Sequence, residues 1–185
     1  MSIKFTEIQN ATERKNVQEL YNKSVPAHEK AYFYPLWWKR NRPNISFVNI
    51  YDEDKWVGFV FFSLYKDLVY VWFFATYDTV HSKAYDSAMF DEMKRLYPDH
   101  RIAVSIEAEN EHADNAAQSI KEKQFYEKNG FRETGYFVKR KADSFEIMLI
   151  GKSFHIEELC SVNKAVYPLI GRFLASDLKK QIQKK

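Results

Sequence analysis

The chain has 185 residues, of which 45% are hydrophobic and 17% aromatic, and a formal net charge of +3. This weak charge, without a basic stripe between aromatic residues, argues against a nucleic-acid partner, and no apolar run is long enough to span a membrane. Cys160 is the single cysteine, which rules out an intrachain disulfide and indicates a reducing, cytoplasmic compartment. We expect one domain over residues 1–185, with residues 152–185 as a C-terminal helical extension.

The first half of the chain is predicted to form a short strand, a helix and three consecutive strands. The first strand lies near residues 3–8, and apolar residues at helical spacing from 17 to 25 indicate the helix, with Thr12 as its N-cap. A short aromatic segment, 32–38, follows between prolines. The strands then cover residues 45–51, 55–65 and 68–76, and the last two form a hairpin.

The second half alternates helices and strands. Helices are expected over residues 82–97, 115–129 and 156–173, and strands over residues 101–106, 135–140 and 145–150. A helix between strands requires a crossover to a parallel neighbour, so the expected class is α/β (α+β) with a mixed central sheet flanked by helices. The basic residues near the end are interpreted as a solvated helix tail; they are Lys179, Lys180, Lys184 and Lys185.

Four short segments carry a resemblance to a known family. The segment 125–131, with the sequence FYEKNGF, ends the second long helix and is followed by Thr134-Gly135-Tyr136. The other segments are Val25–Lys30, Ser105–Glu107 and Phe145–Met148. Taken together in their order along the chain, these segments resemble a bacterial branch of the GNAT superfamily of acyl-CoA-dependent N-acyltransferases. The resemblance extends to about residue 150. The resemblance implies a GNAT fold with an acyl-CoA cleft between two parallel strands, and acetyl-CoA as co-substrate.

The family's cofactor motif is Gln/Arg-x-x-Gly-x-Gly/Ala at the start of a helix, where free backbone N–H groups bind the pyrophosphate. Here His81 replaces Gln/Arg, Ala84 replaces the first glycine and Asp86 replaces the second. A carboxylate about 5 Å from a phosphate costs about 3 kcal/mol at an effective dielectric of about 20, unless it turns outward or Lys83 compensates. The cofactor residues implied by the resemblance are Phe74, Ala75, Thr76, His81, Ser82, Lys83, Ala84, Tyr85, Asp86, Ser87 and Ser119.

Two residues are candidates for the chemistry of acyl transfer. Tyr126 matches the family's tyrosine that protonates the departing thiolate as general acid; alternatively, it anchors the helix end to the core. Glu107, which follows a strand of the predicted cleft, is the candidate base for the ammonium substrate. Its alternative role is to cap the strand or to face water.

Candidate acceptor residues come from the segment after the first helix. Glu29 would attract a cationic amine, and Tyr34 and Trp37 would form a wall of the pocket, although core packing of a short helix explains the aromatic residues as well. No metal site is expected, because the histidines lack ligand spacing.

The sequence leaves two functions open. The first is an N-acetyltransferase that transfers an acetyl group from acetyl-CoA to a small-molecule or peptide amine by direct attack. The second is a non-catalytic GNAT-fold module that binds a protein, a peptide or a small ligand, because both glycines of the loop are lost. Neither nucleic acid nor a membrane is an expected partner. A homodimer through the C-terminal helix is possible, since that helix carries an apolar seam.

Overall fold

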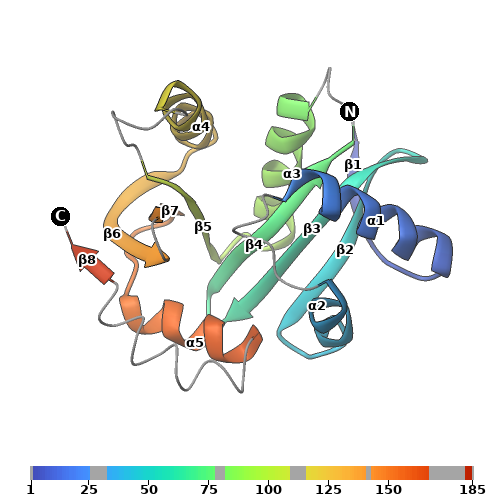
Figure 1. Ribbon diagram of the computed structural model, residues 1–185, viewed down its shortest axis with the longest axis horizontal. Coiled ribbons are helices and arrows are strands. Elements are labelled where there is room, and N and C mark those ends of the chain that lie inside the picture. Colours follow the sequence, from blue (N-terminus) through green and yellow to red (C-terminus); the bar gives the residue numbers. More distant parts are fainter. Residues whose placement is uncertain are drawn as a thin grey trace. The chain divides into compact units, whose positions relative to one another are not determined.

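The computed structural model describes residues 2–25, 33–77, 82–108, 116–140, 143–166 and 182–184. The chain divides into two compact units. Unit 1 comprises Met1–Ser63 and Val71–Pro98, and unit 2 comprises Leu64–Tyr70 and Asp99–Lys185. Helices and strands mix along the chain as expected for the α/β class (Figure 1). No helix among the described residues is long and apolar enough to cross a membrane.

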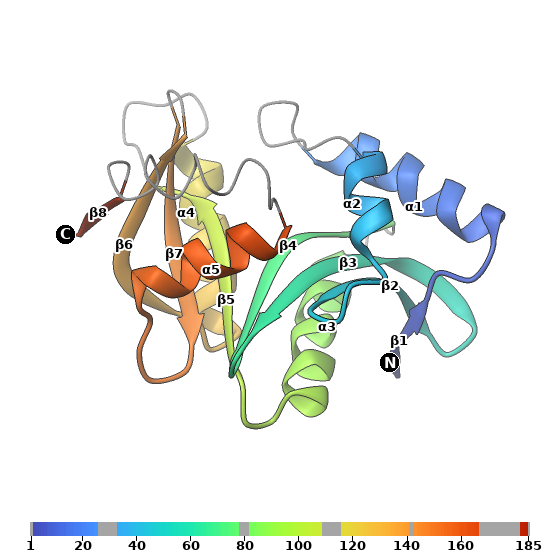
Figure 2. The same cartoon turned by 90° about the horizontal axis from the view of Figure 1, so that it is seen from below.

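Unit 1 is a sheet covered by helices on both faces. Its elements are β1 (Ile3–Glu7), α1 (Ala11–Ser24), α2 (Phe33–Lys39), β2 (Ile45–Asp52), most of β3 (Lys55–Tyr65) and β4 (Leu68–Thr76), and α3 (Ser82–Leu96). The strand order is β1-β2-β3-β4, and β2 is antiparallel to both β1 and β3. Helices α1 and α2 cover one face of this sheet and α3 covers the other (Figure 2).

Neighbouring aromatic residues of β4 show how both faces are buried. The Phe73 ring contacts Tyr21 of α1 at 5.5 Å between ring centroids, whereas the Phe74 ring contacts Phe90 of α3 at 5.4 Å. Successive side chains of a strand point to opposite faces, so a strand covered on both sides needs apolar residues at nearly every position. This explains why β3 and β4 lack the polar alternation of a half-exposed strand.

Helix α1 begins two residues earlier than the predicted N-cap Thr12 implies. The N-cap is Asn10, whose side chain accepts a hydrogen bond of 2.9 Å from the Glu13 backbone N–H. The Glu13 carboxylate in turn accepts from the Gln9 backbone N–H at 2.9 Å. Asn10 and Glu13 have the spacing of a capping box, so the sequence contained the signal that corrects the prediction.

Unit 2 is built mainly from the second half of the chain. Its elements are β5 (Arg101–Glu107), α4 (Ala116–Lys128), β6 (Arg132–Arg140), β7 (Asp143–Ile150), α5 (Ile156–Val166) and β8 (Ile182–Lys184). The order is β5-β7-β6-β8, and each of these neighbours is antiparallel. Strand β8 corrects the interpretation of the last residues as a helix tail, because Lys184 lies opposite Tyr136 of β6. Lys179, Lys180 and Lys185 lie outside the described residues.

The predicted parallel pair is formed by the start of β4 and β5. Arg101, the first residue of β5, donates its backbone N–H to the carbonyl of Asp67, which precedes β4, at 2.7 Å. Further along both strands, the hydroxyl groups of Tyr70 and Ser105 are hydrogen-bonded at 2.5 Å. The two strands therefore start side by side and run in the same direction, so the sheet is mixed, as predicted.

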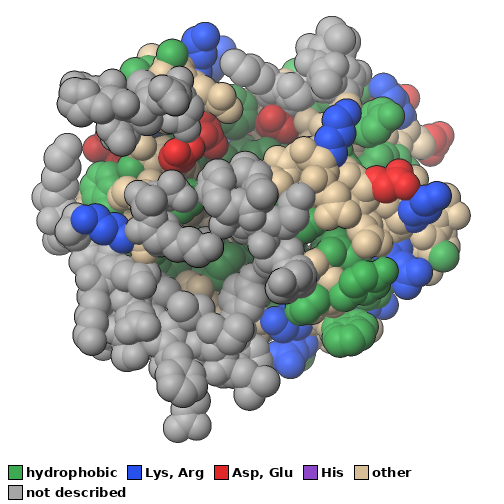
Figure 3. Space-filling view, viewed as in Figure 1, with side chains coloured by type: hydrophobic (Ala, Val, Ile, Leu, Met, Phe, Trp, Pro, Cys, Tyr) green, Lys and Arg blue, Asp and Glu red, His purple; other side chains and the backbone are tan. Residues whose placement is uncertain are grey.

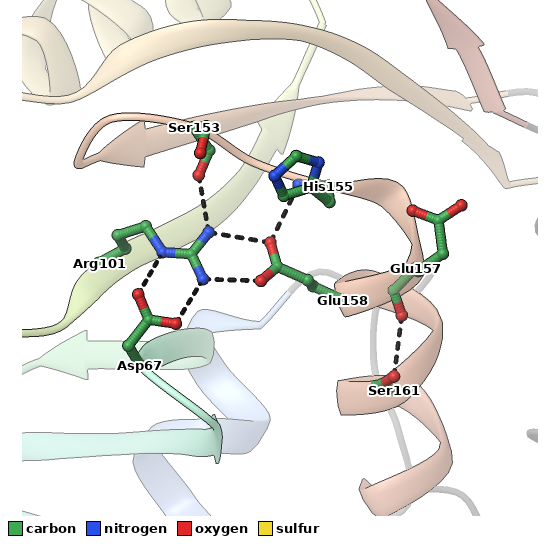
Figure 4. A network of polar contacts seen from close by, with 7 residues as sticks. All are labelled: Asp67, Arg101, Ser153, His155, Glu157, Glu158 and Ser161. Atoms are coloured by element: carbon green, nitrogen blue, oxygen red, sulfur yellow. Dashed lines mark hydrogen bonds and ion pairs between the residues drawn. The ribbon is translucent and has the colours of Figure 1, made fainter.

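Arg101 also organises the polar contacts at this end of unit 2 (Figure 4). Its guanidinium donates two bonds to Asp67, at 2.8 and 2.7 Å, and two to Glu158 of α5, at 2.9 and 2.7 Å. A further bond of 2.7 Å reaches the Ser153 carbonyl. All five guanidinium N–H groups thus donate hydrogen bonds, and these bonds connect α5 to the start of β5.

We expect Arg101→Met to lower the free energy of unfolding by about 2–4 kcal/mol, because it leaves the Glu158 carboxylate, which is 11% exposed, without its cation. Hydrogen bonds from Arg101 lower the pKa of Asp67. Burial raises the pKa of Glu158, but bonds from Arg101 and the His155 N–H outweigh it, so this pKa is also lowered.

The ion pairs of Arg101 therefore stabilise the fold above the ordinary pKa of a carboxylate. This stabilisation is lost as the pH falls through the lowered pKa values of Asp67 and Glu158. Urea unfolding at several pH values measures this stabilisation. The difference in the free energy of unfolding between the native chain and Arg101→Met should become smaller in acid. Lys15→Met is the control, because its ammonium pairs with Glu19 on α1, where the two side chains are 76% and 67% exposed, and its loss should leave stability unchanged. If the control variant lost as much free energy of unfolding as Arg101→Met, the stabilising role of the Arg101 ion pairs would be contradicted.

Candidate functional site

The end of β4 and the start of α3 are joined in unit 1, where the resemblance places the cofactor. Thr76, the last residue of β4, donates its hydroxyl hydrogen to Asp86 Oδ1 at 3.0 Å. Phe74 shares the α3-facing side of the strand with Thr76, while Ala75 is buried at 7% exposure. The carboxylate of Asp86 thus points to β4.

Gly58 of β3 allows the end of β4 to approach closely. A Cβ atom at this position would lie 2.1 Å from the carbonyl oxygen of Ala75, which is closer than a side chain permits. Two residues after Ala75, the Tyr77 backbone N–H donates to the Val57 carbonyl at 2.7 Å. The absence of a side chain at Gly58 therefore sets the path of the strand end that leads to α3.

Burial changes the acidity of Asp86. It raises the pKa of the carboxyl to about 6, and the hydrogen bond from Thr76 offsets part of this effect. The group is ionised at neutral pH and becomes neutral in mild acid. The first turn of α3 contains no acidic residue. Asp86 is the next residue along the helix, so its charge would repel an anion that binds the backbone N–H groups of that turn.

The other residues of the predicted loop have different positions. Ala84 is exposed, Tyr85 is buried at 6% exposure and Ser87 is half-buried. Ser82 and Lys83 begin α3, but their side chains lie outside the described residues, as does His81 altogether.

In unit 2, two predicted site residues lie on one face of α4. Ser119 is 3% exposed and Tyr126 is 6% exposed, and their spacing of seven residues places both on the same side of the helix. The Tyr126 ring meets Phe131 edge-on, with 5.4 Å between centroids. Gly130 makes the turn between helix and strand with a φ of +92°, which a residue with a side chain rarely adopts. The segment 125–131 therefore ends α4 as predicted.

A buried ion pair lies on this same face of α4, and the sequence analysis did not identify it. Lys123 Nζ donates to Glu146 Oε2 of β7 at 3.0 Å and also bonds to Glu133 of β6. Glu146 is 2% exposed. Burial opposes the charge of Lys123, but the two carboxylates outweigh it and raise the pKa of this ammonium. An acidic residue inside the apolar run of β7 was the available signal, since such residues are rarely buried without a partner.

Glu107, the candidate base, lies on the opposite face of the sheet in unit 2. Its neighbour Ile106 is directly opposite Glu146 in the β5–β7 pairing, so those two side chains share a face. Because Glu146 reaches Lys123 of α4, that face is the one covered by α4. Side chains alternate along a strand, and Glu107 therefore points away from α4 and from Tyr126.

The predicted acceptor residues on α2 are partly core and partly surface. Trp37 is buried and its ring lies 3.8 Å from the guanidinium carbon of Arg40. Tyr34 and Trp38 are 53% and 75% exposed, and hydrophobic side chains gather at the surface over α2 (Figure 3). Trp37 thus has the core role that was the alternative to an acceptor wall, whereas Tyr34 remains accessible. Glu29 lies outside the described residues.

The described residues hold no group of three or more histidine, cysteine, aspartate or glutamate side chains that would bind a metal ion. Cys160 is buried in α5. The site candidates are therefore the joined ends of β4 and α3 in unit 1, and the α4 face and the end of β5 in unit 2.

Comparison with known proteins identifies the fold. No protein-family model matches the chain, and no curated protein matches it. Among solved structures, a protein from Bacteroides thetaiotaomicron assigned to the GNAT acetyltransferase family is similar, with a TM-score of 0.70 and 17% identity over 92% of this chain and 98% of the other. The aminoglycoside 6'-N-acetyltransferase from Enterococcus faecium has a TM-score of 0.62 and 14% identity over 83% and 100% of the chains.

A third similar structure is the ribosomal-protein-S18-alanine N-acetyltransferase from Escherichia coli, with a TM-score of 0.54 and 13% identity over 83% and 96% of the chains. This chain covers 96–100% of the length of these three structures. The chain therefore has the fold of the GNAT acetyltransferases.

Proposed function

We propose that the protein is an N-acetyltransferase that uses acetyl-CoA as co-substrate and acts on an amine in the cytoplasm. The observation that carries the proposal is the junction of β4 and α3 through Thr76 and Asp86, in a fold shared with solved N-acetyltransferases. Those structures include proteins named for aminoglycosides, for a ribosomal-protein alanine and for spermidine. An amine carried by a small molecule or a peptide is therefore the proposed acceptor class.

The residues at the junction fit an acyl-CoA in two respects. The start of α3 offers backbone N–H groups for a pyrophosphate, and Oδ1 of Asp86 accepts a hydrogen bond from Thr76 of β4. One solved structure with this fold is an aminoglycoside 6'-N-acetyltransferase in complex with coenzyme A. We assign the pantetheine side of the cofactor to Phe74, Ala75 and Thr76.

Acetyl-CoA would supply the acetyl group as a thioester. Glu107 would accept a proton from the amine nitrogen, so that the lone pair can form the new N–C bond. Tyr126 would give its hydroxyl proton to the sulfur as the C–S bond breaks.

A non-catalytic module is the second candidate, and Asp86 favours it. The carboxylate stands where the family has glycine, and it is ionised at neutral pH because its pKa of about 6 lies below 7. Repulsion between this charge and a pyrophosphate would weaken cofactor binding. In that case the fold would serve to bind a protein, a peptide or a small ligand.

Titration calorimetry with acetyl-CoA, followed by an assay of thiol release with spermidine, an aminoglycoside and a peptide with a free N-terminus, distinguishes the two functions. We expect micromolar binding, which corresponds to about −8 kcal/mol, and amine-dependent thiol release. The reaction without amine controls for hydrolysis of the thioester. No binding by either the native chain or Asp86→Asn at about 1 mM acetyl-CoA, which is about −4 kcal/mol, would exclude the transferase.

A further inference from the structure

Unit 2 contains a pocket that the proposed acetyl transfer does not use. Its volume is about 420 Å³, which is within the usual range for sites that hold small ligands. The wall consists of residues from β6, the end of β7 and the loop that leads to α5. They are Arg132, Glu133, Thr134, Tyr136, Leu149, Gly151, Lys152, Ser153, Phe154 and His155.

A β-bulge in β6 shapes one side of this pocket. The pairing of β6 with β7 shifts between Glu133 and Phe137, and Gly135 within the bulge has a φ of +74°. Thr134 secures the bulge, because its hydroxyl donates to the Ile147 carbonyl at 2.7 Å and accepts from the Tyr136 N–H at 3.2 Å. Bulges of this kind redirect side chains and are common beside functional sites.

Part of the pocket wall is apolar. Leu149 is 4% exposed and Phe154 is 7% exposed. The Tyr136 ring lies 6.0 Å from the Phe154 ring, at an angle of 60° between planes. An aromatic or aliphatic body of a ligand would therefore find apolar surface here.

The mouth of the pocket is positively charged. Arg132 and Lys152 are exposed. Arg132 donates to the Gly151 carbonyl, but neither cation forms an ion pair with any residue in the described part of the chain. The one carboxylate of the wall belongs to Glu133 and is already bonded to Lys123. An anionic group at the mouth would thus meet two cations that lack a described carboxylate partner.

From these observations we infer that the pocket binds a small organic anion, with its carboxylate or phosphate at Arg132 and Lys152 and its apolar body on Leu149, Tyr136 and Phe154. Guanidinium groups bind both anions through parallel N–H donors. The site lies wholly in unit 2 and does not depend on the proposed acetyl transfer.

The test is an amide NMR titration of the full chain at low salt with benzoate and with phenyl phosphate. We expect saturable shifts concentrated in residues 132–136 and 149–155, with dissociation constants in the low millimolar range, or about −3 to −4 kcal/mol. Benzyl alcohol, which has the ring without the charge, should bind at least about tenfold more weakly. Binding of the anions should weaken as salt is added, because ions screen exposed charges.

Variants distinguish this pocket from general attraction of anions. The double change Arg132→Gln and Lys152→Gln should weaken the binding of both anions by about tenfold or more. Lys152→Gln alone should weaken it by about threefold, and the Lys152 side chain has no described contact to lose. Lys128→Gln, an equal charge change on the exposed side of α4, is the matched control and should bind as the native chain does.

Three results would overturn the inference. The first is the absence of shifts at about 20 mM of either anion, which means binding weaker than about −2.3 kcal/mol. The second is equal binding by the native chain and the variants, and the third is equal binding of benzyl alcohol at the same residues.

Discussion

Asp86→Asn is expected to strengthen acetyl-CoA binding about ten- to hundredfold at about pH 7.5, because it removes a charge that opposes the pyrophosphate. Asparagine has nearly the same shape as aspartate and can still accept the hydrogen bond from Thr76. The packing between β4 and α3 should therefore persist. Titration calorimetry of both chains with acetyl-CoA measures the difference.

The pH dependence has a defined sign. Burial raises the pKa of Asp86 to about 6, so its charge disappears as the pH falls through that value. The native affinity for acetyl-CoA should therefore increase between about pH 8 and about pH 5.5, while that of Asp86→Asn should vary less. The variant also corrects for titration of the ligand's own phosphate. Equal affinities and parallel pH profiles would show that Asp86 does not face the cofactor.

A measurement without ligand checks the same carboxyl group. The folded chain holds the proton of Asp86 up to about pH 6, whereas the unfolded chain releases it near the ordinary value of 3.8. The folded state therefore binds more protons in this window, and the free energy of unfolding should fall as the pH rises through it, by at most about 3 kcal/mol.

Asp91→Asn is the matched control for both measurements. Asp91 lies on the same helix, and its side chain is 70% exposed and paired with Lys94 at 2.6 Å. An equal charge change at this position should leave both acetyl-CoA affinity and the pH dependence of stability close to those of the native chain.

Tyr126→Phe is expected to lower kcat about hundredfold with little change in the KM for acetyl-CoA, because it removes the proton for the leaving thiolate but keeps the ring. The contact of this ring with Phe131 should remain, since phenylalanine differs only by the hydroxyl group. Steady-state kinetics of amine-dependent thiol release measure both constants, and amide NMR spectra verify the fold.

Tyr65→Phe provides the control for the loss of a tyrosine hydroxyl. Tyr65 is the last residue of β3 and is outside the proposed sites. Loss of the Tyr65 hydroxyl group should leave kcat unchanged from the native chain. If Tyr126→Phe also retained the native kcat, Tyr126 would have the alternative role of anchoring the end of α4 to the core.

Local sequence patterns were sufficient for most of the secondary structure. The segments of β3, β4, α3 and α4 were predicted nearly to their observed ends, because runs of apolar residues and helical spacing reflect which faces are buried. The short strand β8 was missed. A segment of three residues, Ile182–Lys184, is too short to carry a strand pattern, and β8 exists through its pairing with β6.

The polar contacts within the fold were less accessible to sequence reasoning. Lys123 and Glu146 lie 23 positions apart in the chain, and Arg101 and Glu158 lie 57 apart. The local sequence pattern does not indicate which of these residues pair with one another. Glu146 lies within an apolar strand, which predicts that it has a charged or polar partner but does not identify that partner. Their pairing depends on the order of strands in the sheet and on the helices that cover it.

By itself, the sequence determined the element order as far as α5, the mixed α/β fold, the helix end at Gly130 and the departures at Ala84 and Asp86 from the family's loop, because these follow from neighbouring residues. Only the tertiary structure decided that Asp86 bonds to Thr76, since this contact requires the close passage of β4 at Gly58. It likewise placed Glu107 and Tyr126 on opposite faces of a sheet. Such positions depend on register and packing between distant segments, which the local sequence does not encode.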